Sequence, residues 1–184
     1  VAFGLVKRGG GVTDIKVRLL DRPDGLKMGV VHVMANPCDA MGANVINQVC
    51  EYLKSPIEEL TGEKVTMCIL SNLVTTKITK SEVVLEKINA ELAEKIEEAS
   101  LFAELDSYRA ATSNKGVLNG IDPILIATGN DWRAVEAGIH AYAARSGRYQ
   151  SITTWRREGN RLIGRFEAPL IVGTVGGVTT LHPS

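Results

Sequence analysis

The chain has 184 residues, which suits one large domain or two small ones, and its 45% apolar content is enough to fill a core. Its 21 basic residues balance its 21 acidic residues, so no overall charge attracts nucleic acid or an anionic membrane. The longest apolar runs are far shorter than a membrane span, and no secretory signal is visible. We therefore expect a cytoplasmic protein with no nucleic-acid or membrane partner.

Cysteine and histidine are few and scattered. The cysteines are odd in number and widely spaced, which favours free thiols, buried or half-buried in a reducing compartment, over a disulfide framework or a zinc site. These residues are Cys38, Cys50 and Cys68. The histidines show no metal-ligand spacing, so no metal is expected; they are His32, His140 and His182.

Alternating side chains predict an antiparallel hairpin near the start of the chain. Ile15, Val17 and Leu19 alternate with charged residues, which is the period of a strand with one wet face. A Pro-Asp-Gly turn within residues 22–25 follows, and residues 28–34 fit the partner strand.

A helix and a third strand are expected next. The helix opens near Asp39 and ends at Gly62, and Ser55-Pro56 within it predicts a kink or a fresh helix start. Residues 64–70 fit a strand, so the first 70 residues form a predicted β-β-α-β unit.

Residues 81–105 give the strongest helical pattern in the sequence. Apolar residues recur there at helical spacing, and Lys87 with Glu91 forms an expected i,i+4 pair on the opposite, solvated side. The apolar stripe consists of Leu85, Ile88, Leu92, Ile96 and Ala99.

The last part of the chain contains one ambiguous segment, a helix and a hairpin. Residues 122–126 fit either a helix that starts at an Asp-Pro pair or a strand. Residues 131–146 are typical of a helix that stops at Gly147. Residues 152–157 and 161–167 are typical of a hairpin.

Polar donors gather around Lys115, which we expect in a loop. A lysine in a loop is usually only an exposed residue, but the neighbouring side chains here can bind a carboxylate or stabilise an oxyanion. These neighbours are Arg109, Ser113, Asn114 and Asn119.

Three further features admit both a structural and a functional interpretation. Asp131 lies at a helix start, where it can be an ordinary cap or, beside Lys115, can hold the lysine and help to move protons. The loop at 39–44 precedes a helix and suits either a phosphate or tight packing, without the G-x-G-x-x-G fingerprint. The glycine-rich residues 173–177 suit close approach to a ligand or a plain turn.

A series of motifs resembles, in the same order, those of the 3-hydroxy-3-methylglutaryl-coenzyme A reductases. The residues of these motifs are similar to those of the class II enzymes of bacteria and archaea, and the match covers nearly the whole chain. The motifs are Asp39-Ala-Met-Gly-Ala-Asn44, Ile69-Leu-Ser-Asn72, Tyr108-Arg-Ala-Ala, Asn114-Lys-Gly, Asn119-Gly-Ile-Asp, Ala127-Thr-Gly-Asn-Asp-Trp-Arg-Ala-Val-Glu-Ala-Gly138 and Val172-Gly-Thr-Val-Gly-Gly177.

The resemblance implies a two-step, four-electron reduction in which a thioester, and then an aldehyde, each accept a hydride from NADH or NADPH. The reaction converts hydroxymethylglutaryl-coenzyme A into mevalonate and coenzyme A, or runs in reverse. By similarity, Lys115 stabilises the oxygen of the reacting carbonyl and Asp131 is the catalytic aspartate near it. The substrate-binding residues implied are Arg109, Asn119 and Ser71.

The resemblance also assigns the nicotinamide dinucleotide to the loop before the first predicted helix. The residues implied are Asp39, Met41, Gly42, Ala43, Asn44, Asn72 and Gly176. The expected fold is α+β. Residues 1–70 are expected to be part of a small NAD(P)-binding domain with a split antiparallel, ferredoxin-like, non-Rossmann sheet. Residues 71–184 are expected to be part of a mainly helical large domain that binds substrate and coenzyme A.

The chain departs from the family's pattern near both ends. The family's catalytic glutamate lies in an upstream Glu-Asn-Val-Ile-Gly motif and its catalytic histidine on a downstream segment, and the sequence contains neither. His182 lies in the Leu181-His-Pro183 context that follows the glycine turn and is not that histidine, and Ser113 stands where several relatives carry a histidine. We therefore expect a central fragment without turnover of its own.

Family active sites are completed between subunits, so we expect a homodimer or a higher homo-oligomer. The alternative to an enzyme is that this piece alone is a non-catalytic module that binds coenzyme A or a nucleotide.

Overall fold

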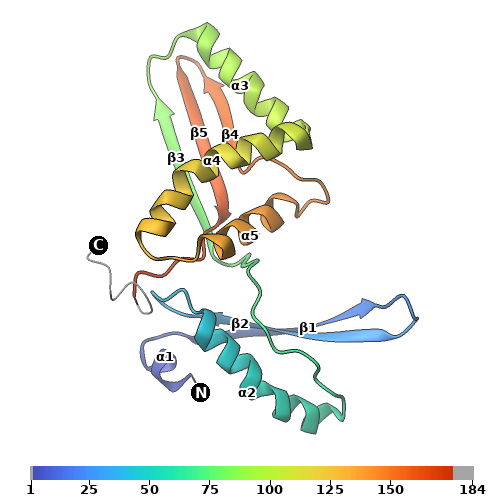
Figure 1. Cartoon of the computed structure of the whole chain (residues 1–184). Coiled ribbons are helices and arrows are strands. Elements are labelled where there is room, and N and C mark those ends of the chain that lie inside the picture. Colours follow the sequence, from blue (N-terminus) through green and yellow to red (C-terminus); the bar gives the residue numbers. More distant parts are fainter. Residues whose placement is uncertain (1, 176–184) are drawn as a thin grey trace. The chain divides into compact units, whose positions relative to one another are not determined.

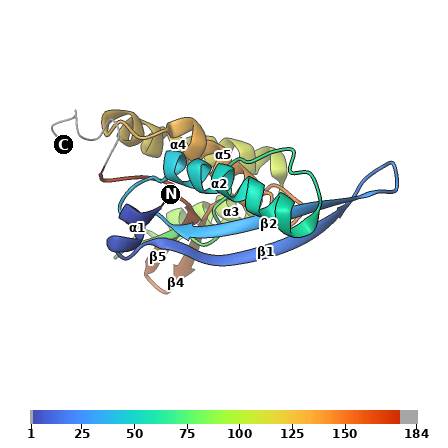
Figure 2. The ribbon, with the colours of Figure 1, turned by 90° about the horizontal axis from the view of Figure 1, so that it is seen from below.

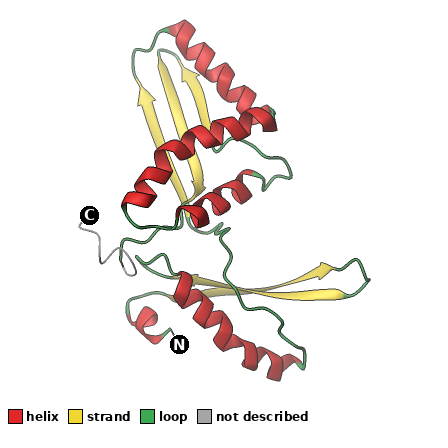
Figure 3. Cartoon of the chain, viewed as in Figure 1, coloured by secondary structure: helices red, strands yellow, loops and turns green. Residues whose placement is uncertain are grey.

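The computed structural model of the chain describes residues 2–175, which form two compact units (Figure 1). The first unit contains residues 2–70 together with 173–175, and the second contains residues 71–172. Each unit combines helices with an antiparallel sheet of its own, so the chain is α+β, as predicted (Figure 3). Within residues 2–175, no helix is both long and apolar enough to cross a membrane.

A long two-stranded hairpin dominates the first unit (Figure 2). After the short helix α1 (Phe3–Lys7), strand β1 (Gly11–Asp21) pairs with strand β2 (Lys27–Asn36). Both strands are longer than predicted. Ile15 lies opposite Val33, so the apolar residues of the two strands share one face, and the predicted turn joins the strands.

Helix α2 (Ala43–Thr61) begins later than the predicted start at Asp39, and Gly42 is its cap residue. The helix passes through Pro56 without a fresh start, although the proline lacks an N–H group that could donate to the preceding turn. It ends, as predicted, at Gly62, whose φ of +71° is the left-handed conformation that glycine tolerates.

The prediction of a strand over 64–70 is wrong, because this segment pairs with no strand among the described residues. Side chains of α2 bind its backbone instead. The N–H of Val65 donates to the carboxylate of Glu58 at 2.8 Å, and the N–H of Leu70 donates to the side-chain oxygen of Asn47 at 2.9 Å. The segment therefore packs along a helix and not beside a strand.

The second unit contains a three-stranded antiparallel sheet with the order β3-β5-β4. Strand β5 (Arg161–Pro169) is central and pairs with β3 (Ile78–Leu85) on one side and with β4 (Thr153–Glu158) on the other. The predicted hairpin is confirmed as β4 and β5.

The prediction of a helix over 81–105 is wrong in its first part. Residues 81–85 belong to β3, because their two valines suit a strand and the ladder with β5 is available. Lys87 has φ 55°, a left-handed conformation outside any helix, so it cannot form the expected i,i+4 pair with Glu91 on one helix. Asn89 then caps α3 (Ala90–Leu105) with its side-chain oxygen.

Helix α3 covers the outer edge of β4. The Oγ atom of Ser100 accepts a hydrogen bond from the N–H of Trp155 at 2.9 Å, and the carboxylate of Glu97 accepts one from the N–H of Arg157 at 3.4 Å. These side chains satisfy two backbone donors that a bare edge strand would leave open.

Helices α4 (Ser107–Ala127) and α5 (Trp132–Ala143) supply most of the core of this unit. Lys115 lies within α4 and not in the expected loop, and α4 also continues through the Asp122-Pro123 pair. Residues 122–126 therefore neither start a helix nor form a strand. The buried core consists of Leu118, Leu125, Val135, Ile139, Tyr142, Ala143, Ile152 and Ala168.

Candidate active site

Helix α4 presents Lys115 and Asn119 one turn apart, and both side chains are exposed. Among the residues that the structure describes, none forms a hydrogen bond or an ion pair with the side chain of Lys115. Its ammonium group can therefore bind an external anion or a polarised oxygen. Arg109, also predicted at the site, lies in the first turn of α4 and is half-buried.

The residue before Lys115 fixes this part of α4. Asn114 is completely buried; its side-chain N–H donates to the carbonyl of Gln150 at 3.0 Å, and its side-chain oxygen accepts from the N–H of Ile152 at 3.0 Å. Asn114 is therefore not available as the predicted donor to a carboxylate or an oxyanion. Its structural role could not be found from the sequence, because both partners lie more than 30 residues along the chain.

Asp131 is the cap residue of α5, as predicted, and accepts a hydrogen bond from the N–H of Ala134 at 3.2 Å. Its carboxylate also lies 3.7 Å from the Nε atom of Arg133. Within the described residues, no ion pair joins Asp131 to Lys115. The joint role of these two residues stays a prediction.

A pair of carboxyl groups connects α4 with α5. Asp122 lies two turns after Lys115 on the same side of α4, and its Oδ1 atom is buried without a hydrogen-bond donor in the described part of the chain. Burial raises the pKa of Glu136 on α5, the charge and hydrogen bonding of Asp122 raise it further, and His140 opposes the shift. A proton held on the carboxyl of Glu136 provides a donor for Asp122 and accounts for both observations. No motif in the sequence indicates this pair, because its members lie on different helices.

Ser71 and Asn72 open the second unit. The Oγ atom of Ser71 accepts from the N–H of Leu73 at 3.2 Å. The backbone of Asn72 lies against α5, where a Cβ atom added at Gly138 would be 2.6 Å from the Asn72 carbonyl oxygen. Glycine at 138 therefore permits the close approach of residue 72 to the helix.

In the first unit, two segments predicted to bind the cofactor lie in contact. The N–H of Thr174 donates to the carbonyl of Asp39 at 2.8 Å, and a Cβ atom added at Gly173 would lie 2.5 Å from the backbone nitrogen of Met41. The remaining predicted residue of the glycine turn, Gly176, lies outside the described residues.

The start of α2 is bare backbone. Gly42 has φ +95° and offers no side chain to cap the helix, and none of the described side chains does so. The N–H groups of Ala43 and Asn44 in the first turn have no helical acceptor, and the helix dipole adds positive potential there. This arrangement is suited to an anionic group.

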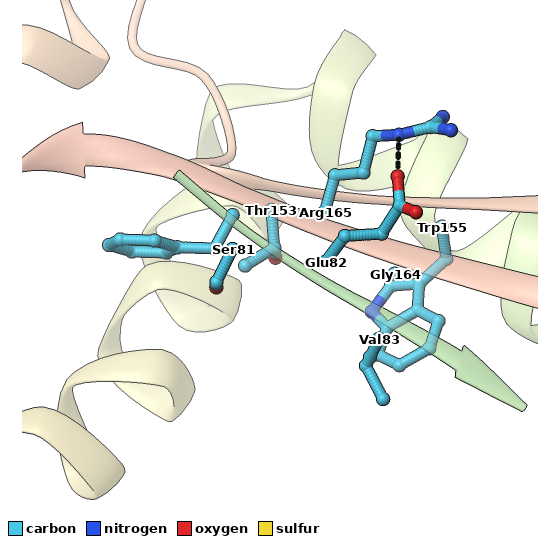
Figure 4. Close-up of a pocket in the computed structure, with 8 residues that line it drawn as sticks. Ser81, Glu82, Val83, Thr153, Trp155, Gly164 and Arg165 are labelled. Carbon is cyan, nitrogen blue, oxygen red and sulfur yellow. Dashed lines mark hydrogen bonds and ion pairs between the residues drawn. The ribbon is translucent and has the colours of Figure 1, made fainter. Parts of the chain in front are cut away.

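A hollow of about 130 Å³ lies on the sheet of the second unit (Figure 4). In it the ring of Trp155 lies across Gly164, where an added Cβ atom would be 2.6 Å from the ring. The volume is well below the roughly 300 Å³ of small ligand sites, and no residue predicted at the active site lines it. The lining residues are Ser81, Glu82, Val83, Thr153, Trp155, Gly164, Arg165 and Phe166.

The chain matches the family model described as hydroxymethylglutaryl-coenzyme A reductase over residues 2–184. The 3-hydroxy-3-methylglutaryl-coenzyme A reductase of Archaeoglobus fulgidus is 45% identical over 184 residues, which covers 97% of this chain and 42% of that protein. A probable 3-hydroxy-3-methylglutaryl-coenzyme A reductase of Borreliella burgdorferi is 34% identical, with 96% of this chain and 42% of that protein covered.

Solved structures give the same result. The class II 3-hydroxy-3-methylglutaryl-CoA reductase from Streptococcus pneumoniae, bound to NADPH in open conformations, superposes with a TM-score of 0.92 and 43% identity. The superposition covers 98% of this chain and 51% of that one. The chain thus spans about half the length of the relatives that it matches.

Proposed function

Because this chain belongs to the hydroxymethylglutaryl-coenzyme A reductase family, we propose that the protein containing it converts 3-hydroxy-3-methylglutaryl-coenzyme A into mevalonate and coenzyme A. A nicotinamide dinucleotide is the proposed electron donor. The two-step, four-electron reduction requires a group that stabilises negative charge on a carbonyl oxygen and groups that manage protons.

The observation that carries this proposal is the position of Lys115. Its ammonium group is exposed and unpaired among the described side chains, while the buried Asn114 beside it holds α4 in place. A cation that projects from a fixed helical turn and has no acidic partner is available to a carbonyl oxygen that gains negative charge. Asn119, one turn further along, is the proposed amide donor to the substrate, and Arg109 and Ser71 are further proposed contacts.

Asp131 is the proposed acid–base partner. As the cap of α5 it is held by the N–H of Ala134, so its carboxylate has a defined position at a helix start. In the proposed mechanism it orients the ammonium of Lys115 when substrate is bound and takes part in proton transfer to the reduced oxygen.

The start of α2 fits the pyrophosphate of the proposed cofactor. The bare N–H groups after Gly42 are donors for phosphate oxygens, and Gly173 lets its segment lie close to Met41 without a side chain in the way. When bound, the cofactor supplies hydride. NADPH is the form to test first, because the Streptococcus pneumoniae relative is bound to NADPH. Asp39, Ala43, Asn44, Asn72 and Gly176 complete the proposed set.

The test is NADPH oxidation by the full-length protein, followed at 340 nm with hydroxymethylglutaryl-coenzyme A. Lys115→Ala should lower kcat by about 100- to 1,000-fold, as expected when one oxyanion-stabilising group is removed. Lys95→Ala, at an exposed lysine of α3, is the matched control and should leave kcat unchanged. Near-normal turnover of Lys115→Ala would remove this residue from the mechanism. NADPH binding without turnover by the parent protein would favour a binding module instead.

We also propose that the protein acts as a homodimer or higher homo-oligomer in the cytoplasm, as the family resemblance implies. Light scattering of the full-length protein measures the oligomeric state, and a monomer with full activity would contradict the proposal.

A further inference from the structure

Two of the three cysteines lie on elements that pack against each other in the first unit. All three are free and half-buried, as the sequence predicted. Cys50 belongs to α2, and Cys68 belongs to the segment at 64–70, which is neither helix nor strand and whose backbone is bound by α2 side chains.

Two hydrogen bonds fix how this segment runs along the helix. Val65 is bound by Glu58 and Leu70 by Asn47, so the segment runs antiparallel to α2. Five residues of extended chain cover about 16 Å, and the eleven residues between the two helix contacts also advance about 16 Å along the axis. The segment is therefore just long enough to run straight along the helix between the two hydrogen bonds.

This register places Cys68 opposite Cys50. Cys68 lies about three fifths of the way from Val65 to Leu70, which corresponds on α2 to the turn that contains Cys50. Cys50 is also three residues after Asn47, on the helix side that faces the segment.

The exposure pattern of the segment agrees with this placement. Met67 and Ile69 are 76% and 62% exposed, whereas Cys68 between them is half-buried. Side chains of an extended chain alternate in direction, so Cys68 points toward α2 when its two neighbours point away. Burial raises the pKa of the Cys50 thiol, and the nearby Cys68 raises it further.

We propose that Cys50 and Cys68 form a reversible intramolecular disulfide, which makes this pair an oxidation site that ties the 64–70 segment to α2. Glutathione disulfide is the proposed oxidant. The thiolate of one cysteine attacks it and releases one glutathione, and the second cysteine attacks the resulting mixed disulfide and releases the other. The two protein thiols lose two protons and two electrons in all, and two glutathione molecules gain them. Nothing in this step depends on the proposed catalytic function.

The experiment uses the full-length protein, incubated with glutathione disulfide, alkylated and digested with trypsin without reduction. Residues 28–54 and 65–77 are separate tryptic peptides, but the first contains both Cys38 and Cys50. The Cys38→Ser variant therefore makes the assignment unambiguous. We expect the two peptides to be linked in the parent and in Cys38→Ser, and released by dithiothreitol.

Cys50→Ser and Cys68→Ser are expected to lose the linked peptide completely, while Cys38→Ser is the matched control that keeps it. A link that persists in Cys50→Ser, glutathione on single cysteines without a link in the parent, or a disulfide between two chains on a non-reducing gel would each overturn the proposal. A second measurement needs no variant: the oxidised parent should be cleaved after Lys64 several-fold more slowly than the reduced parent. Equal cleavage rates would count against tethering of the segment.

Discussion

The buried side-chain oxygen of Asn114 accepts a hydrogen bond from the backbone N–H of Ile152 at 3.0 Å, which joins the middle of α4 to the entrance of β4. The same amide donates to the carbonyl of Gln150. One completely buried side chain therefore satisfies two backbone groups and fixes the helical turn from which the neighbouring lysine projects. Its removal leaves both groups unpaired in the interior.

Asn114→Ala should lower the free energy of unfolding by about 2 to 4 kcal/mol. The substitution leaves the carbonyl of Gln150 and the N–H of Ile152 without hydrogen-bond partners, and it leaves a cavity. Asn119→Ala, at an exposed position of the same helix, is the control and should change it by less than about 0.5 kcal/mol. Urea unfolding measures both. Equal effects at the two positions would show that the buried hydrogen bonds contribute little.

Gly138→Ala should destabilise the protein by about 1 to 3 kcal/mol, because the new Cβ atom would lie 2.6 Å from a backbone oxygen of residue 72 that cannot rotate away. Gly120→Ala is a matched control within α4, where nothing lies within 4 Å of the added Cβ atom. It should stabilise the protein by about 0.5 to 1 kcal/mol through helix propensity. Thermal unfolding should therefore shift in opposite directions, and a stabilising Gly138→Ala would contradict the close approach.

Glu104 and Arg156 form a two-point ion pair at 2.6 and 2.8 Å, with side chains 22% and 34% exposed. Hydrogen bonding to Arg156 lowers the pKa of Glu104 below 4.5, and Ser100 adds to this shift while burial opposes it. The folded state thus favours the ionised form. The resulting stability is present above about pH 4.5 and is lost as the pH falls through the lowered pKa.

Glu104→Gln should therefore cost about 1 to 2 kcal/mol at pH 7, since the pair is partly screened by water, and should weaken the loss of stability below pH 4.5. Glu91→Gln removes an exposed pair with Lys95 on the same helix and should have almost no effect. Urea unfolding from pH 3 to pH 7 tests both statements. If Glu104→Gln lost stability below pH 4.5 as steeply as the parent does, Glu104 would not be the cause of that loss.

The pKa of Glu136 is shifted the other way, upward from 4.5, by burial and by Asp122. The folded protein holds this proton more tightly than the unfolded chain does. Its contribution to stability is complete below pH 4.5 and is lost as the pH rises through the raised pKa. Glu136→Gln keeps a donor for the buried oxygen of Asp122 at every pH.

Glu136→Gln should therefore be more stable than the parent at pH 8, and its stability should depend less on pH above 4.5. Glu98→Gln, at an exposed position of α3, provides the control for loss of one negative charge. Thermal unfolding between pH 4 and pH 8 is the measurement. A variant whose stability keeps the parent's pH dependence would argue against a proton held on Glu136.

Local sequence signals are sufficient to predict those elements whose turn and cap residues lie within the element or directly beside it. The hairpin of β4 and β5 is predicted correctly because Gly159, at φ +64°, lies in the turn between the two predicted strands. Helix α5 was found from its cap, Asp131. Both depend on residues within one element, which a single sequence shows directly.

Elements that depend on distant partners could not be found in this way. Residues 81–85 extend the apolar stripe of α3, yet they form a strand because Val83 pairs with Gly164, some 80 residues away. The segment at 64–70 was predicted as a strand, but side chains of α2 bind its backbone. In each case tertiary contacts decide between two conformations that the local pattern permits equally.

The residues of the candidate site also fall into two groups: those that local motifs indicate and those that only tertiary packing reveals. The order of the motifs in the sequence identified the family, and Lys115, Asn119 and Asp131 were named from those motifs. The two carboxyls of Asp122 and Glu136 come from different helices and carry no local signature, so only their packing reveals them.

The contacts of α3 with β4 also decide how the sheet of the second unit can grow. Ser100 and Glu97 bind two of the backbone donors along the β4 edge, and Ser151 binds that of Thr153, so an incoming strand finds these donors already bound. The β3 border has no such cover among the described residues, and it offers Val83, Val84 and Leu85. Aberrant polymerisation of this unit through strand addition is therefore one-sided: it begins at β3.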